Sequence, residues 1–144
     1  FTFDDHRNRL SHVFRTTLVA LSEYETVSTH KYLTFKQSAD QLEFEVQDLN
    51  GPDASCGFKG DLLPRGDGFT SNGSYACVNP VPSPGTFYRL ESLKVDSWGF
   101  LSGTLYTSAK QDLSNPYVRK FFGICVNQNV DVSLPPPGTE ARCK

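Results

Sequence analysis

The alternation of apolar and polar residues is strictest in the segment QLEFEVQDL, residues 41–49. Leu42, Phe44 and Val46 alternate there with polar residues, and side chains two apart on a strand share one face. This segment therefore predicts a half-buried β-strand. Looser strand patterns, rich in β-branched and aromatic residues and bounded by Gly, Pro, Asn or Asp, fill most of the remaining chain. They span residues 15–24, 30–37, 55–59, 74–78, 86–95, 98–108 and 121–134.

About eight strands with frequent turns in a chain of 144 residues predict a mainly β protein, either an antiparallel β-sandwich or a small β-barrel. A hairpin is expected around Asp96-Ser97, and a Gly-rich loop is expected over residues 62–73. Trp98 and the numerous Phe and Tyr residues are expected in the core of this domain.

Helix is expected in one place at most. Residues 4–14 could form a short helix that Asp4 or Asp5 caps, although their apolar stripe is narrow. No linker or repeat divides the chain, so residues 1–144 are expected to form one domain. Residues 1–14 would then be an N-terminal extension or helix, and residues 135–144 a tail.

The four cysteines are Cys56, Cys77, Cys125 and Cys143. An even number without the close spacing of metal ligands favours disulfides over a metal site. Three pairings are possible, and the most local one, Cys56–Cys77 with Cys125–Cys143, is predicted. Each bridge would close a loop of about 20 residues, for which chain entropy favours the folded state by roughly 3 kcal/mol. The second bridge would also hold the proline-rich tail against the domain.

Composition narrows the possible functions. The formal net charge is −2 with both signs interspersed, which offers no basic stripe for nucleic acid. The longest apolar run, Phe121 to Val126, is six residues, too short to span a membrane. The chain begins at Phe1 and contains no Met, which fits a processed chain whose signal peptide has been removed. A secreted, extracellular protein is therefore expected.

The order of several features resembles a known family. A strand ends in Leu21-Ser22-Glu23-Tyr24, and the strictly alternating strand later leads into Cys56. Tyr75-x-Cys77 follows, then two Phe- and Leu-rich strands, and finally the Cys-containing segment that runs from Cys125 to Pro135. Over about residues 15–135 this order is similar to the Alternaria major-allergen family of small secreted fungal β-barrel proteins. The chain departs from the family in its last cysteine, Cys143, which follows the final strand.

The resemblance implies an antiparallel β-barrel or sandwich, no enzymatic activity, and a role at the interface between a fungus and its host. Members of the family act as effectors, elicitors of plant defence or allergens. The expected partner is therefore a host protein, with a plant as the expected host. No cofactor and no metal are predicted.

Two motifs are candidates for recognition or modification. Arg65-Gly66-Asp67 would place a cation and an anion on either side of a glycine bend, within a loop closed by Cys56–Cys77. Loops on a rigid β scaffold often bind partners, so residues 57–73 are a candidate recognition element; the alternative is a polar connecting turn. Asn72-Gly73-Ser74 is an acceptor sequon for N-glycosylation.

Catalytic candidates are weaker. Glu43 and Glu45 would lie about 7 Å apart on one strand face, a separation compatible with glycoside hydrolysis, although the alternation predicts that this face is solvated. A ribonuclease-like set would need His12, His30, Glu23 and Glu25 to converge. The chain has no GxSxG motif and no unpaired cysteine under the predicted bridges. The two remaining classes are a binding effector and, as the alternative, a small secreted hydrolase such as a ribonuclease-like enzyme.

Overall fold

The computed structural model describes residues 10–21, 26–49, 55–78, 86–127 and 139–143. Every regular element in these ranges is a β-strand, and none is a helix. The strands are β1 (Val13–Leu21), β2 (Thr26–Ser38), β3 (Gln41–Asp48), β4 (Ser55–Asp61), β5 (Leu63–Arg65), β6 (Gly68–Val78), β7 (Thr86–Val95), β8 (Phe100–Ser108) and β9 (Tyr117–Asn127).

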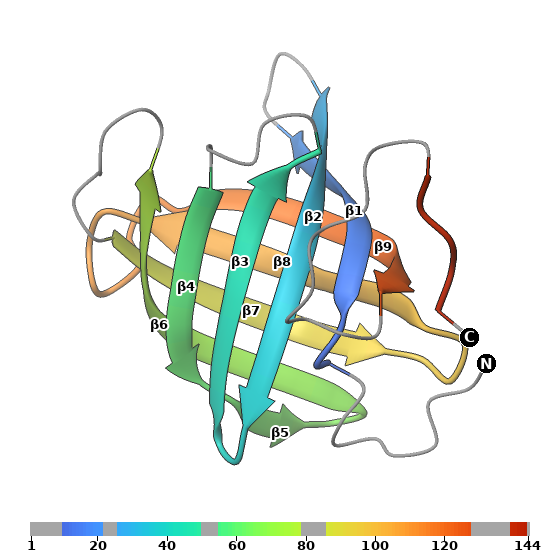
Figure 1. Ribbon diagram of the computed structural model, residues 1–144. Helices are drawn as coiled ribbons and strands as arrows, with labels where there is room; N and C mark the ends of the chain where they lie inside the picture. Colours follow the sequence, from blue (N-terminus) through green and yellow to red (C-terminus); the bar gives the residue numbers. More distant parts are fainter. Residues whose placement is uncertain (1–9, 22–25, 50–54, 79–85, 128–138, 144) are drawn as a thin grey trace.

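The strands form one closed antiparallel barrel. Their order is β4-β3-β2-β1-β9-β8-β7-β6-β5, and an additional pairing of β4 with β6 closes eight of them into a cylinder (Figure 1). The short β5 pairs with β6 outside this ring. The mainly β prediction is confirmed, and of the two predicted architectures the protein adopts the barrel.

Several predicted boundaries were wrong. The stretch 62–73 is mostly strand, because β5 and the first half of β6 occupy it. The last strand begins at Tyr117, earlier than predicted, and its predicted part 128–134 lies outside the described residues. Val13 and Phe14 begin β1 rather than ending a helix. The helix candidate over residues 4–9 lies outside the described residues.

Aromatic side chains fill the barrel interior. On β3, Leu42 and Phe44 are buried while Glu43 and Glu45 are exposed, as the alternation predicts. The Phe44 ring stacks on Phe35 of β2 at 5.2 Å and on Phe58 of β4 at 4.3 Å between ring centroids. Phe58 stacks in turn on Tyr75 of β6 at 4.6 Å. A row of rings therefore runs along the inner face of the sheet from β2 to the closing strands.

The closure between β4 and β6 depends on two facing glycines. Gly60 of β4 lies opposite Gly73 of β6 in the ladder. A Cβ atom on Gly73 would overlap the Lys59 carbonyl oxygen and lie 2.6 Å from the Gly60 Cα. A Cβ atom on Gly60 would likewise overlap the Asn72 carbonyl oxygen. The two backbones can approach this closely only because neither residue has a side chain.

Both predicted disulfides are confirmed. Cys56 and Cys77 are ladder partners on β4 and β6, so their bridge reinforces the closing strand pair. Cys143 bonds to Cys125 of β9, and its backbone N–H donates to the Cys125 carbonyl oxygen at 2.9 Å. The second bridge therefore holds residues 139–143 against the barrel. Two disulfides of this kind fit an extracellular protein.

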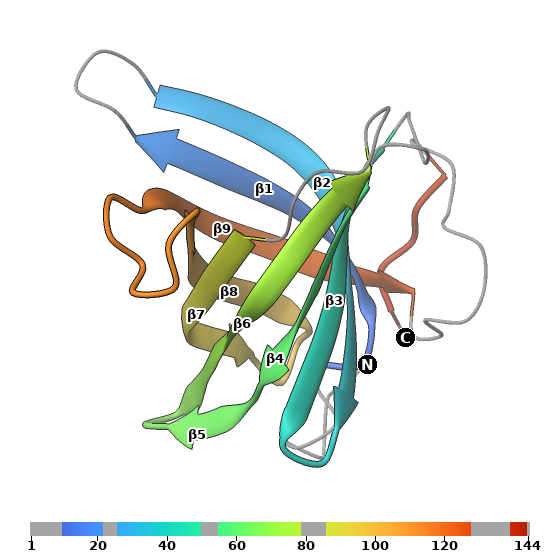
Figure 2. The same ribbon diagram turned by 90° about the vertical axis from the view of Figure 1, so that its left-hand side faces the viewer.

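The hairpin of β1 and β2 extends beyond the neighbouring β3. β3 pairs with β2 only from Lys31 to Ser38, whereas β1 pairs with β2 along its whole length. Residues Thr26–His30 are all exposed. Figure 2 shows this end of the hairpin leaving the wall of the barrel.

Candidate functional site

Arg65-Gly66-Asp67 forms the tip of a tight hairpin between β5 and β6. Arg65 pairs with Gly68, which leaves Gly66 and Asp67 as a two-residue turn. Gly66 has a φ of 62°, the positive value that a type II′ turn needs at its first central position. The Asp67 carboxylate accepts a hydrogen bond from the Lys94 ammonium at 2.6 Å. The motif is thus an exposed turn tied to β7 rather than part of a long permissive loop.

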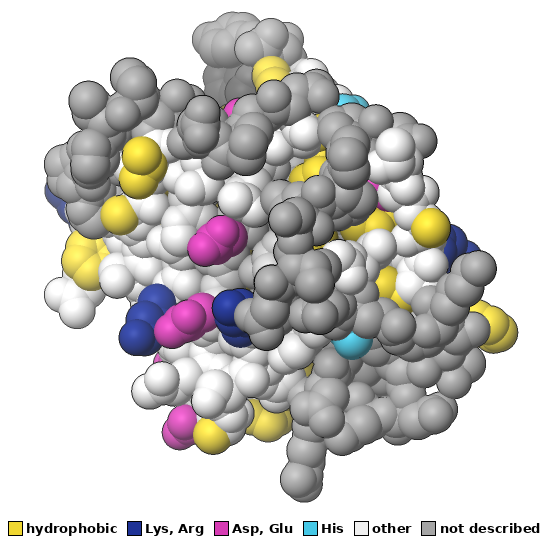
Figure 3. All heavy atoms as spheres, in the orientation of Figure 1, with side chains coloured by type: hydrophobic (Ala, Val, Ile, Leu, Met, Phe, Trp, Pro, Cys, Tyr) yellow, Lys and Arg dark blue, Asp and Glu magenta, His cyan; other side chains and the backbone are white. Residues whose placement is uncertain are grey.

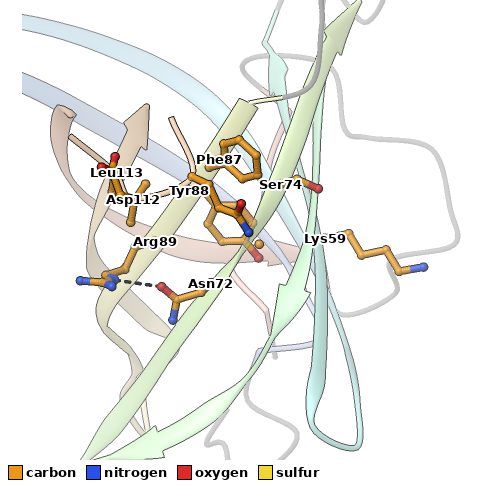
Figure 4. Close-up of a pocket in the computed structure, with 10 residues that line it drawn as sticks. Lys59, Asn72, Ser74, Phe87, Tyr88, Arg89, Asp112 and Leu113 are labelled. Atoms are coloured by element: carbon orange, nitrogen blue, oxygen red, sulfur yellow. Dashed lines mark hydrogen bonds between the residues drawn. The ribbon is translucent and has the colours of Figure 1, made fainter. Parts of the chain in front are cut away.

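Asn72 of β6 lines a pocket of about 490 Å³ (Figure 4). Residues of β4, β6 and β7 form one side of it, and residues of the segment joining β8 to β9 form the other. The described residues that line the pocket are Lys59, Asn72, Gly73, Ser74, Phe87, Tyr88, Arg89, Gln111, Asp112 and Leu113. This lining includes amide, hydroxyl, charged and aromatic groups, but no histidine.

The charged groups of this pocket have close partners. The Arg89 Nε donates to the Asn72 Oδ1 at 2.9 Å, and its guanidinium lies 3.8 Å from the Glu91 carboxylate. The Lys59 ammonium lies 3.5 Å from the Glu43 carboxylate. The Asp112 carboxylate accepts from the Ser114 backbone N–H at 3.0 Å. The pocket is therefore a polar recess, and its described lining offers no histidine–carboxylate pair for acid–base catalysis.

The other catalytic candidates do not converge. Glu43 and Glu45 lie on the solvated face of β3, where side chains of both charges are interspersed (Figure 3). His12 directly precedes β1, whereas His30 lies opposite Thr17, so roughly 17 Å of strand separates the two imidazoles. The His30 Nδ1 lies 3.1 Å from the Thr17 hydroxyl. Glu23 and Glu25 lie outside the described residues.

Three large aromatic side chains are exposed on β8, β9 and the turn before β8. Trp98 is 61% exposed, Phe100 46% and Phe122 55%. Phe100 and Phe122 lie on the outer face of the adjacent strands β8 and β9. Phe122 pairs directly with Ser102, so Phe100, two residues before Ser102, is its diagonal neighbour. Diagonal neighbours of this kind lie about 7–8 Å apart. The expectation that Trp98 belongs to the core was wrong, because it lies in the turn between β7 and β8 rather than on a strand.

Arg142 joins these aromatic residues to the C-terminal segment. Its guanidinium lies 4.7 Å from the centre of the Phe100 ring and donates to the Trp98 carbonyl oxygen at 2.8 Å. We call Trp98, Phe100, Phe122 and Arg142 the aromatic patch. One signal in the sequence could have revealed part of it: Phe121 and Phe122 are adjacent, and neighbouring residues on a strand face opposite sides.

The C-terminal segment is also held by a nearly buried carboxylate. Glu140 accepts hydrogen bonds from the Tyr32 hydroxyl at 2.8 Å and from the Arg15 guanidinium at 3.1 Å. Its side chain is only 5% exposed. A carboxylate removed from water needs such partners. Glu140 therefore anchors the segment on the outer face of β1 and β2, close to the Cys125–Cys143 bridge.

Two buried tyrosines resist ionisation. Burial, then the hydrogen bond to Glu140 and the charge of that carboxylate, raise the pKa of Tyr32 to about 12, although Arg15 opposes the shift. Burial and the charge of Asp61 raise the pKa of Tyr88 to about 12, although the hydrogen bond between its hydroxyl and that of Ser71 opposes the shift. Both hydroxyls are therefore held in the neutral form.

The raised tyrosine pKa values predict a loss of stability in alkali. An unfolded tyrosine releases its proton near pH 10, whereas Tyr32 and Tyr88 release theirs near pH 12 when folded. The stabilisation is complete below pH 10 and is lost as the pH rises from 10 to 12. Urea unfolding followed by circular dichroism across this range should show the decrease, and Tyr32→Phe should make it smaller. A free energy of unfolding that stays constant to pH 12 would contradict this explanation.

No protein-family model, curated protein sequence or solved structure matches this chain. Within the described residues, no group of three or more His, Cys, Asp or Glu side chains could hold a metal ion. Those residues also contain no helix long and apolar enough to cross a membrane.

Proposed function

We propose that this chain is a secreted effector-type protein that acts by binding a protein target through the aromatic patch. The observation that carries the proposal is the exposure of Phe100 and Phe122 as diagonal neighbours on the outer face of β8 and β9, with the exposed Trp98 two residues before Phe100. Exposed apolar side chains that cluster in this way commonly mark an interaction surface. The two disulfides support an extracellular place of action.

The composition of the patch favours a protein partner. Trp and Arg are among the residues that contribute most binding energy in protein interfaces, and aromatic residues are enriched there. Lys120 is exposed and comes two residues before Phe122 on the outer face of β9, so it and Arg142 add positive charge beside the aromatic rings. The complementary target would offer an apolar pocket with carboxylates at its rim.

The nature of the target rests on the order of strands and cysteines. That order resembles the Alternaria major-allergen family, which favours a fungal origin and a host protein, with a plant as host. The alternative function, a small secreted hydrolase, has no support from the described pocket, whose lining lacks a histidine.

The patch can be tested by comparing a variant of its aromatic residues with a control variant of an exposed apolar residue elsewhere on the barrel. The variant Phe100→Ser/Phe122→Ser is expected to bind the target at least 30-fold more weakly, the loss that corresponds to a hot spot of about 2 kcal/mol. The protein would be immobilised and exposed to plant extracellular fluid, a captured protein purified, and its affinity for each variant measured by surface plasmon resonance. The control Leu63→Ser, 48% exposed on β5, should bind like the wild type.

The same experiment separates the patch from the Arg65-Gly66-Asp67 turn. Arg65→Ala/Asp67→Ala should bind like the wild type if the patch is the interface. A loss of affinity in this variant alone would move the binding site to the β5–β6 hairpin. Equal affinities for all variants would contradict both sites, and hydrolysis of RNA by the wild-type protein would support the alternative function instead.

A further inference from the structure

We infer that Asn72 carries an N-linked glycan, which covers the pocket side of the barrel and leaves the aromatic patch accessible. Asn72-Gly73-Ser74 is the single N-x-S/T sequon in the chain, and the disulfides fit the compartment in which this modification occurs. The inference shares the secretory route with the proposed function but does not depend on the patch.

The placement of the sequon on β6 suits an attached sugar. Buried Ser71 points into the barrel, so Asn72 and Ser74 share the outer face of the strand, and Gly73 points inward. Asn72 lines an open pocket of about 490 Å³ rather than packing in the core. A glycan at this position would therefore extend into solvent without disturbing the aromatic rings inside.

The hydrogen bond of the Asn72 side chain is compatible with the modification. The Asn72 Oδ1 accepts from the Arg89 Nε at 2.9 Å, and the amide nitrogen points away from Arg89 (Figure 4). Glycosylation changes the nitrogen and keeps the carbonyl oxygen as an acceptor. The bond to Arg89 would therefore persist and would orient the first sugar away from β7.

The chemistry requires one co-reactant, a lipid diphosphate-linked oligosaccharide in the secretory compartment. The Asn72 Nδ2 attacks C1 of its first N-acetylglucosamine, forming the C1–Nδ2 bond while the bond from C1 to the diphosphate oxygen breaks. The lipid diphosphate leaves with the bonding pair, and one amide proton passes to a base of the transferase. The transfer takes place on the chain before it folds, so the strand hydrogen bonds of Asn72 do not prevent it.

The location on the barrel separates the glycan from the aromatic patch. β6 and β9 are separated by β7 and β8 in the sheet order, and the pocket lies on the outer face of β4, β6 and β7. The glycan would therefore shield the polar wall of the barrel. Phe122 and the patch around it would stay open to a partner.

The full chain, secreted from yeast behind a signal peptide, provides the test. Wild-type protein and Ser74→Thr should lose mass on treatment with peptide N-glycosidase, which converts the glycosylated Asn72 to Asp. Ser74→Ala and Asn72→Gln should be secreted without the glycan, so the enzyme should leave their mass unchanged. Because Ser74 is exposed, the Ser74 variants should fold like the wild type, so the result does not depend on the stability of Asn72→Gln.

An unmodified Asn72 peptide in both the wild-type protein and Ser74→Thr would overturn the inference. That outcome would leave the proposed binding function intact, because the aromatic patch is tested by affinity. Conversely, a glycan on Asn72 combined with equal affinities for all patch variants would contradict the proposed interface and support the modification.

Discussion

Gly73→Ala is expected to lower the free energy of unfolding by about 3 kcal/mol or more, at the upper end of what overpacking costs. The added methyl group would overlap the Lys59 carbonyl oxygen, and the atoms that it meets are all backbone atoms of β4, which cannot move aside as a flexible side chain can. The β4–β6 ladder would have to separate, and this ladder is the only one that closes the ring of described strands. Chemical denaturation followed by circular dichroism would measure the change.

Gly57→Ala is the matched control for the closing strands. Gly57 lies on β4, three residues before Gly60, and an added Cβ would have no atom within 4 Å. This substitution should be neutral or stabilise by about 0.5 kcal/mol, because alanine restricts the unfolded chain. If the two variants unfolded at the same denaturant concentration, the steric explanation of barrel closure would have to be abandoned.

Phe44→Ala is expected to lower the free energy of unfolding by about 4 kcal/mol, through lost burial and the cavity left behind. The Phe44 ring is 2% exposed and contacts the rings of Phe35, Phe58 and Tyr88. Its removal would interrupt the row of rings on the inner face of the sheet. The same denaturation experiment measures this loss.

The neighbouring residue on the outer face gives the control for this prediction. Glu45→Ala replaces an exposed side chain of the same strand and should change stability by less than about 0.5 kcal/mol. A loss of stability as large for Glu45→Ala as for Phe44→Ala would show that strand propensity, and not core packing, accounts for the effect.

The candidate sites show which kinds of site can be predicted from local sequence. Asn72-Gly73-Ser74 and Arg65-Gly66-Asp67 are contiguous motifs, so both were found without the structure. The aromatic patch was missed, because Trp98 and Phe100 approach Arg142 only after folding. The contact of Glu140 with Arg15 joins residues 125 positions apart, and no periodicity in the sequence indicates such a pair.

The sequence by itself determined the mainly β class, the faces of β3 and the two disulfides. Strand alternation is a local property with a period of two, so polar residues between Leu42, Phe44 and Val46 define the buried face directly. The cysteine pairing followed from short sequence separations and from a proline-rich tail that needed an attachment. Strand alternation and cysteine spacing both depend on residues that are close together in the chain, so they can be read directly from the sequence.

The tertiary structure alone decided that the sheet closes into a barrel and which aromatic side chains remain outside. Closure depends on Gly60 meeting Gly73, and glycines in a sequence do not show which backbone will approach them. Where both faces of a strand carry apolar residues, as at Phe121 and Phe122, alternation defines two faces but does not show which is buried. Only the register of β9 between β1 and β8 places Phe121 inside and Phe122 in solvent.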